Sequence, residues 1–110
     1  AIEVHRHLGP GLLESAYQRC LAHELALNGI AFIVDRPLPL SYKGIDLHCG
    51  YRLDIVVENR LILELKAVER LLPIHQAQML TYLRLLKLKQ GLLINFNVPR
   101  LVDGVKSLLL

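Results

Sequence analysis

The chain has 110 residues, of which 53% are hydrophobic, and this size and composition predict a single folded domain with one core. Thirteen basic and ten acidic residues give a formal net charge of +3, which permits a polyanionic partner without requiring one. Charged residues interrupt every apolar stretch before it reaches the length of a membrane-spanning helix, and no signal-peptide pattern opens the chain. We therefore expect a soluble, cytoplasmic protein without a membrane partner.

The first segment, Ala1 to Leu8, has the spacing of a short amphipathic helix that ends at Gly9-Pro10-Gly11. Because the amphipathic pattern is already under way at Ile2, we expect residues 1–110 to form one domain that lacks part of its native N-terminal segment. Cys20 and Cys49 are too few and too isolated for a disulfide framework or a zinc site. We expect both to be buried free thiols.

The rest of the pattern predicts the order helix, three-stranded meander, helix, strand, helix. The first long helix starts near Leu12 and stops at Asn28-Gly29, and the next begins at Pro73, a residue that suits the first helical turn. A turn is expected at Lys43-Gly44 and another near Asn59. The predicted strands are 30–34, 40–42, 45–57, 61–68 and 91–96, and the predicted C-terminal helix is 101–110.

A strand that follows a helix generally returns beside its predecessor in parallel, so 91–96 is expected to lie parallel to 61–68. The predicted fold class is therefore α/β, in the form of an α+β fold whose sheet is mixed. A central strand that is covered on both faces is normally a continuous apolar run. The segment 91–96 follows this rule, whereas Glu64-Leu65-Lys66 breaks it.

Three charged residues, Asp54, Glu64 and Lys66, lie in the most hydrophobic part of the chain. Burying an ion is costly unless it is paired or binds a ligand, so these charges need a reason. Side chains alternate along a strand, which places Glu64 and Lys66 on the same face. With a turn near Asn59, Asp54 lies opposite Glu64 or within one residue of it, and opposed Cβ atoms are ~5 Å apart. One cation can then contact both carboxylates.

Two carboxylates, a neighbouring backbone carbonyl and water molecules suit Mg²⁺ or Mn²⁺. Such an ion activates water, and Lys66 would supply positive charge where the transition state becomes negative. The alternative is a structural ion-pair network in which Lys66 neutralises both carboxylates without a metal. Perturbed charge clusters concentrate at functional sites, which favours the metal site.

The two long helices carry further polar candidates. Glu14 and Tyr17 are three residues apart and Gln78 and Tyr82 are four apart, so each pair shares a helix face. A Gln amide and a Tyr hydroxyl can orient a phosphate, a water or a sugar. Taken alone, Glu14 is better explained as a solvated acid near a helix N-terminus, and Gln78 and Tyr82 are equally well explained as ordinary helix residues.

These residues together match the pattern of a known family. The chain resembles the small bacterial GxxExxY proteins, which are grouped with the PD-(D/E)XK nuclease superfamily, and the likeness spans nearly all of it. The segments that carry the resemblance are Gly11-x-x-Glu14-x-x-Tyr17, Gly50-Tyr51-Arg52-Leu53-Asp54, Glu64-Leu65-Lys66-Ala67, Gln78 and Leu93-Ile94-Asn95-Phe96.

The resemblance implies a restriction-endonuclease-like αβββαβ core, followed here by the predicted C-terminal helix. It implies that Asp54, Glu64 and Lys66 fill the three signature positions and Glu14 the helical acidic position. Gln78 and Tyr82 look like the Gln-x-x-x-Tyr motif of RecB-like exonucleases. Leu53 stands where the signature has proline, which leaves the ligands in place.

The sequence thus predicts a Mg²⁺- or Mn²⁺-dependent nuclease that hydrolyses phosphodiester bonds of DNA, with RNA as the less favoured substrate. The catalytic residues would be Glu14, Asp54, Glu64 and Lys66. The metal would be held by Asp54, Glu64 and the backbone carbonyl of Leu65, with Glu14 acting directly or through water. Tyr17, Gln78 and Tyr82 would position the substrate.

Two other functions stay open: a catalytically inactive nucleic-acid-binding or protein-interaction module on the same fold, and a hydrolase of small phosphoesters. Two Phe and four Tyr offer little for a base-stacking platform, so contacts with phosphates are expected to dominate. Because so small a chain has limited surface for gripping a duplex, a homodimer or a protein partner is expected.

Overall fold

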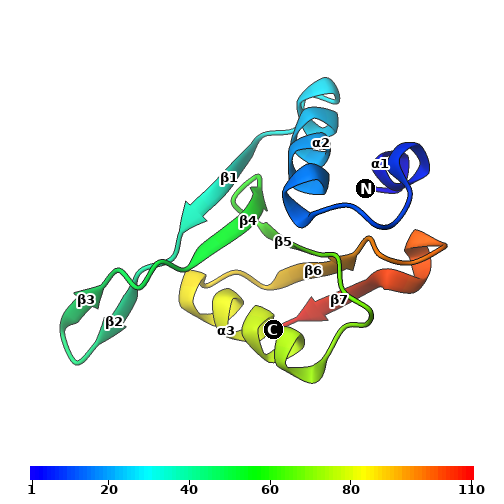
Figure 1. Cartoon of the computed structure of the whole chain (residues 1–110). Helices are drawn as coiled ribbons and strands as arrows, with labels where there is room; N and C mark the ends of the chain where they lie inside the picture. The colour runs from blue at the N-terminus through cyan, green and yellow to red at the C-terminus, as the bar shows by residue number, and fades with distance from the viewer.

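A computed structural model describes residues 1–110 and shows a five-stranded mixed sheet with helices on both faces, together with a separate two-stranded sheet (Figure 1). The helices are α1 (Ile2–Leu8), α2 (Glu14–Leu27) and α3 (Pro73–Leu86), and a 3-10 helix η1 spans Leu101–Gly104. The strands are β1 (Phe32–Pro37), β2 (Leu40–Tyr42), β3 (Ile45–Leu47), β4 (Arg52–Val57), β5 (Leu61–Lys66), β6 (Gln90–Asn95) and β7 (Val105–Leu109).

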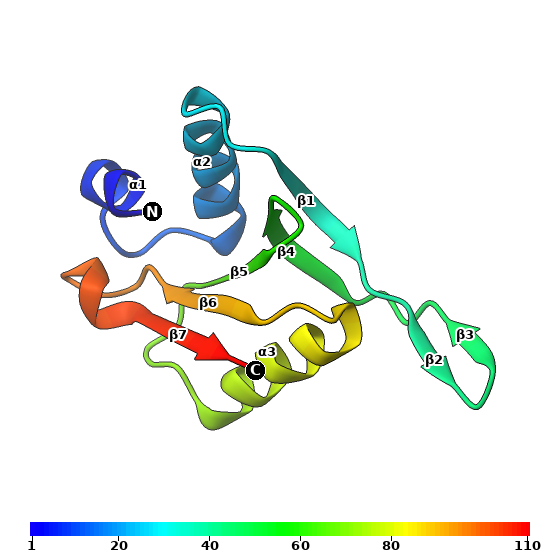
Figure 2. The same ribbon diagram turned by 180° about the vertical axis from the view of Figure 1, so that it is seen from behind.

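The main sheet has the strand order β1-β4-β5-β6-β7. Strands β5 and β6 are parallel and every other neighbouring pair is antiparallel, which confirms the predicted crossover through α3. Helices α1 and α2 lie on one face of the sheet and α3 lies on the other, as Figures 1 and 2 show from opposite sides. The mixed α/β fold class predicted from the sequence is therefore confirmed.

Each face of the sheet has its own apolar core. Leu63 and Leu65 of β5 belong to the cluster that packs under α1 and α2, whereas Ile62 belongs to the cluster that packs against α3. Since side chains alternate along a strand, Glu64 and Lys66 project towards the α3 face. This assignment decides which helix lies beside the charged residues.

The predicted helix boundaries agree with the structure. Helix α2 ends at Leu27 and is capped by Asn28, and Gly29 follows with φ +68°, a left-handed conformation that glycine adopts without steric cost. Helix α3 starts at Pro73 and ends at Leu86, and its cap residue Lys87 has φ +58°. None of the helices has the length and apolar character needed to cross a membrane.

The prediction of a C-terminal helix at 101–110 is wrong. The structure has a single 3-10 turn there, followed by β7, which pairs antiparallel with β6. The spacing of Leu101, Val105 and Leu108 suits a helix, but in the strand only Leu108 is buried. Strand β6 would otherwise expose a row of unpaired backbone groups at the edge of the sheet, and β7 satisfies them.

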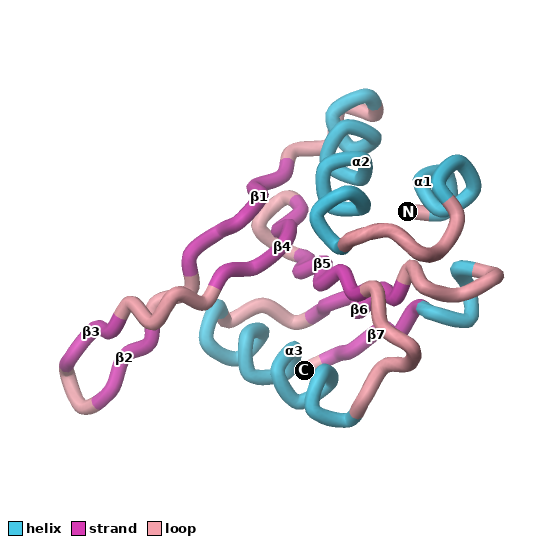
Figure 3. The backbone as a smooth tube through the Cα atoms, viewed as in Figure 1, coloured by secondary structure: helices cyan, strands magenta, loops and turns pink.

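The single strand predicted at 45–57 is in fact two strands. Strand β3 ends at Leu47, the chain turns through Gly50, whose φ is +80°, and β4 starts at Arg52. Strand β4 pairs with β1, whereas β3 pairs only with β2 in a hairpin that projects from the main sheet (Figure 3). The meander of the main sheet is therefore β1-β4-β5, and the hairpin is an excursion between β1 and β4.

The expectation of buried thiols is also wrong, because Cys20 and Cys49 are free and exposed. Helix α2 buries Tyr17 and Leu21 instead, which turns the neighbouring Cys20 outward. Cys49 lies in the irregular segment between β3 and β4.

Gly104→Ala tests how the C-terminal strand is held. A Cβ at Gly104 would overlap the carbonyl oxygen of Asn95 and touch Val98, so either the turn or the end of β6 must shift. We expect the substitution to lower the free energy of unfolding by about 1–3 kcal/mol, the usual cost of overpacking. Chemical denaturation measures this, with Val102→Ala as the control because Val102 is 64% exposed in the same turn. Equal stability of the two variants would contradict this account of β7.

Candidate active site

The centre of the site is a carboxylate pair on adjacent antiparallel strands. Pairing of β4 with β5 sets Ile55 opposite Leu63, so the next pair outward is Asp54 and Glu64, as predicted. The amide of Asp54 donates to Oε1 of Glu64 at 3.1 Å, and the amide of Leu65 donates to Oδ2 of Asp54 at 2.8 Å. Side-chain oxygens therefore replace carbonyl oxygens at this end of the ladder, and both carboxylates are fixed.

Each carboxylate of the pair uses one oxygen for the backbone and keeps the other free. Oδ1 of Asp54 and Oε2 of Glu64 accept no hydrogen bond within the protein. No fully buried side-chain oxygen or nitrogen lacks a partner, so both free oxygens reach solvent. The pair thus presents two unbonded acceptor oxygens, while backbone amides hold the other two oxygens in place.

Burial makes this pair an unfavourable place for two negative charges. It raises the pKa of Glu64 to about 8, and the charge of Asp54 adds to the rise. Burial also raises the pKa of Asp54, while the amide of Leu65 and the charge of Lys66 lower it. A cation bound between the two free oxygens would offset both the desolvation and the mutual repulsion.

Lys66 lies on the same face as Glu64 but is not bonded to either carboxylate. The ion pairs of the structure are those of Glu3 with Arg6 and His7, far along the chain in α1. A network in which Lys66 directly neutralises Asp54 and Glu64 is therefore not what the structure shows. Its positive charge acts on both carboxylates only through space, where it opposes the rise of their pKa values.

Glu14 joins the pair from the first residue of α2. Its Oε2 accepts the amide of Ala67 at 3.1 Å, which ties the start of α2 to the end of β5. The charge of Glu14 raises the pKa of Asp54 and of Glu64. The other oxygen, Oε1, accepts no hydrogen bond, so Glu14 adds a third free acceptor near the pair.

Sequence reasoning missed Gln18, which lies one helical turn after Glu14. Its Nε2 donates to the carbonyl oxygen of Asp54 at 3.0 Å and to Oδ1 of Asp35 at 2.9 Å. Asp35 has φ +51° inside β1, and its charge also raises the pKa of Asp54. The available signal was the spacing of four residues, which puts Gln18 on the same face of α2 as Glu14.

The structure places Tyr17 outside this group. Its side chain is fully buried, and its ring stacks on Phe96 with centroids 4.3 Å apart. The hydroxyl donates to the carbonyl of Gly9 at 2.6 Å and accepts the amide of Leu12 at 3.2 Å. Tyr17 therefore holds the loop that leads into α2, and its position does not support the predicted contact with substrate.

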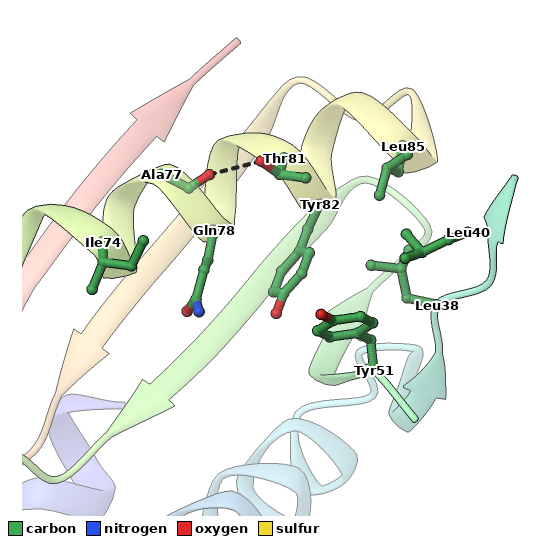
Figure 4. Close-up of a pocket in the computed structure, with 9 residues that line it drawn as sticks. All are labelled: Leu38, Leu40, Tyr51, Ile74, Ala77, Gln78, Thr81, Tyr82 and Leu85. Carbon is green, nitrogen blue, oxygen red and sulfur yellow. Dashed lines mark hydrogen bonds between the residues drawn. The ribbon is translucent and has the colours of Figure 1, made fainter. Parts of the chain in front are cut away.

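Gln78 and Tyr82 line a cavity of ≈ 250 Å³ on the α3 face, and Tyr51 forms part of the opposite wall (Figure 4). Burial raises the pKa of Tyr82, and the charge of Glu64 is the next cause. The cavity therefore neighbours the carboxylate pair.

The donor set fits a hard divalent cation in an open site. No three acidic, histidine or cysteine side chains are close enough to enclose a metal by themselves. Two carboxylates with vacant positions for water and substrate are nonetheless the coordination that Mg²⁺ commonly has in proteins. Of the predicted site residues, Asp54, Glu64, Lys66 and Glu14 are brought together, with Gln78 and Tyr82 in the adjoining cavity.

Comparison with known proteins identifies a family. The model of a family described as the PD-(D/E)XK nuclease superfamily matches residues 1–108. No curated protein and no solved structure matches the chain significantly.

The raised pKa of Glu64 predicts a pH dependence of stability. Between pH 4.5 and about 8 the folded chain keeps a proton on Glu64 that the unfolded chain loses. The stabilisation is therefore present at low pH and is lost as the pH rises to about 8, by at most about 1.4 kcal/mol per pH unit. Denaturation of metal-free protein should show this decline in the wild type and a smaller one in Glu64→Gln. Parallel pH profiles would contradict the assignment.

Gln18→Ala tests the positioning of Asp54 from α2. Loss of the two hydrogen bonds should lower the free energy of unfolding by roughly 1–3 kcal/mol, taking about 0.5–1.5 kcal/mol for each bond. It should also weaken Mg²⁺ binding measured by calorimetry, because the backbone of Asp54 loses its support. Gln76→Ala is the matched control, since Gln76 lies on α3 and its side chain makes no hydrogen bond. A variant that loses stability but binds Mg²⁺ normally would remove the positioning role.

Proposed function

The chain belongs to the PD-(D/E)XK nuclease superfamily, and from this premise we propose that it hydrolyses phosphodiester bonds of DNA with a bound Mg²⁺ or Mn²⁺. RNA is the less favoured alternative as the substrate. The resemblance to the GxxExxY proteins supports the same assignment, because Gly11, Glu14 and Tyr17 occupy that motif. A homodimer or a partner protein is proposed to extend the small surface available for the nucleic acid.

The metal would be held by Oδ1 of Asp54, Oε2 of Glu64 and the backbone carbonyl of Leu65, with Glu14 contributing through a water molecule. A divalent ion in such a site lowers the pKa of a bound water and offsets charge on the phosphate. The protein backbone positions these ligands, since the amides of Asp54 and Leu65 hold the other oxygens of the pair in place. Little reorganisation is then needed when the substrate arrives.

Lys66 would act on the scissile phosphate. It lies two residues after Glu64 on the same face of β5, about 7 Å further along the strand. Because it forms no ion pair, its ammonium is available to stabilise the negative charge that grows on the phosphate oxygens during attack by water. After attack, the bond between phosphorus and the leaving sugar oxygen breaks and the leaving oxygen takes a proton.

The observation that carries this proposal is the reciprocal hydrogen bonding of Asp54 and Glu64 to the opposing strands. It fixes the buried carboxylate of Glu64 beside the half-buried carboxylate of Asp54 with one free oxygen each, although burial and mutual repulsion oppose their ionisation. Buried ionic groups seldom increase stability by themselves, so a bound cation is the better explanation of this arrangement.

Labelled DNA and a Mg²⁺ titration test the function directly. Wild-type protein should cleave the DNA only with Mg²⁺ or Mn²⁺, and Glu64→Ala and Lys66→Ala should each reduce the rate by about 100-fold or more, as expected for lost transition-state charge stabilisation. Glu69→Ala and Lys89→Ala are the controls, because both residues are exposed and lie outside the site. Circular dichroism confirms that each variant is folded.

Calorimetry separates this function from a non-catalytic module on the same fold. Mg²⁺ should bind the wild type and bind Glu64→Gln much more weakly. Cleavage that survives both alanine substitutions would remove the site assignment. An absence of both cleavage and divalent-ion uptake would instead favour an interaction module.

A further inference from the structure

The cavity beside the carboxylate pair is built from neutral side chains. It lies between α3 and the chain on either side of the β2–β3 hairpin, and its lining contains no charged residue. Its volume of ≈ 250 Å³ is smaller than the about 300–1,000 Å³ of pockets that bury a drug-sized ligand. A single flat ring system is therefore a suitable occupant.

Two tyrosine rings form facing parts of its wall. Tyr51, immediately before β4, is 47% exposed, and Figure 4 shows its ring next to that of Tyr82 from α3. The Gln78 amide points from α3 in the same direction as Tyr82. The hydroxyl of Thr81 is already bonded to the carbonyl of Ala77, but the polar groups of Tyr51, Gln78 and Tyr82 have no partner within the protein.

The cavity lies near the carboxylate pair. Tyr51 precedes Asp54 by three residues, which is about 10 Å along an extended chain. Glu64 projects to the same face of the sheet as α3, and the charges of Glu64 and Asp54 both raise the pKa of Tyr82. A neutral pocket thus adjoins an anionic, cation-binding position.

We propose that this cavity binds one unpaired nucleobase of the strand whose phosphodiester lies at Asp54 and Glu64, an inference that rests on the proposed function. A nucleobase is flat and neutral, so it can stack on a tyrosine ring and present polar edges to the Gln78 amide. The phosphate cannot be satisfied in an uncharged pocket and is directed to the metal position. A nucleic acid joins a flat neutral ring to a phosphate in this way.

The substrate class follows from the same geometry. A paired base must leave its stack to enter the cavity, which costs a few kcal/mol, whereas an unpaired base enters without that cost. Single strands, overhangs and frayed ends are therefore the preferred substrates over the interior of a duplex. The low aromatic content suggested little base stacking, but the fold gathers two of the four tyrosines at one position.

Binding to two single-stranded oligonucleotides of equal length and charge tests this subsite, one with bases and one abasic throughout, with divalent ions removed by EDTA. The wild type should bind the strand with bases roughly 5- to 150-fold more tightly, the factor that corresponds to stacking of one base. Tyr51→Ala should lose most of this preference, whereas Tyr51→Phe, which keeps the ring, should retain it. Tyr42→Ala is the matched control, because Tyr42 is 61% exposed on the hairpin and does not line the cavity.

Equal binding of the two strands by the wild type, or an unchanged preference in Tyr51→Ala, would overturn the subsite and leave the cavity to an apolar segment of a partner protein or a second copy. Because this assay needs no metal, it fails separately from the proposed function. A base preference without any Mg²⁺-dependent cleavage would refute the nuclease and keep the subsite. Cleavage that is equally fast at paired and unpaired positions would keep the nuclease and refute the subsite.

Discussion

The site depends on one constraint: the carboxylates of Asp54 and Glu64 each accept a backbone amide of the opposing strand. In an ordinary antiparallel ladder the amides of Asp54 and Leu65 would donate to carbonyl oxygens, and any charged side chains would be free to turn towards water. Here the carboxylates accept those amides themselves. They are consequently held in a place where burial raises the pKa of both, and each keeps one oxygen that accepts no hydrogen bond.

The surrounding elements each support one side of this arrangement. From α2, Glu14 bonds the amide of Ala67 and Gln18 bonds the carbonyl of Asp54, so the helix fixes both strands at the point where their pairing ends. On the opposite face, α3 provides the neutral wall that contains Gln78 and Tyr82. The site is thus charged where a phosphate would bind and uncharged where a base would stack.

Local rules predicted the fold well wherever a residue acts alone. Gly29 after α2, Pro73 at the start of α3 and the turn at Lys43-Gly44 depend only on backbone conformations that these residues favour. The rules failed at the C-terminus, because the spacing of Leu101, Val105 and Leu108 suits a helix, whereas the structure forms a strand in which only Leu108 is buried. The open edge of β6, the preceding strand, made the strand the better solution.

The candidate site likewise has a part that short-range rules predicted and a part that they did not. Charges inside an apolar run, side-chain alternation and one turn were enough to place Asp54 opposite Glu64 with Lys66 on the same face, because all of these are short-range properties of a hairpin. Contacts between elements far apart in sequence could not be predicted from such short-range properties. Folding buried Tyr17, recruited Gln18 and moved Tyr51 next to Tyr82, since each of these outcomes depends on how helices pack on the two faces of the sheet.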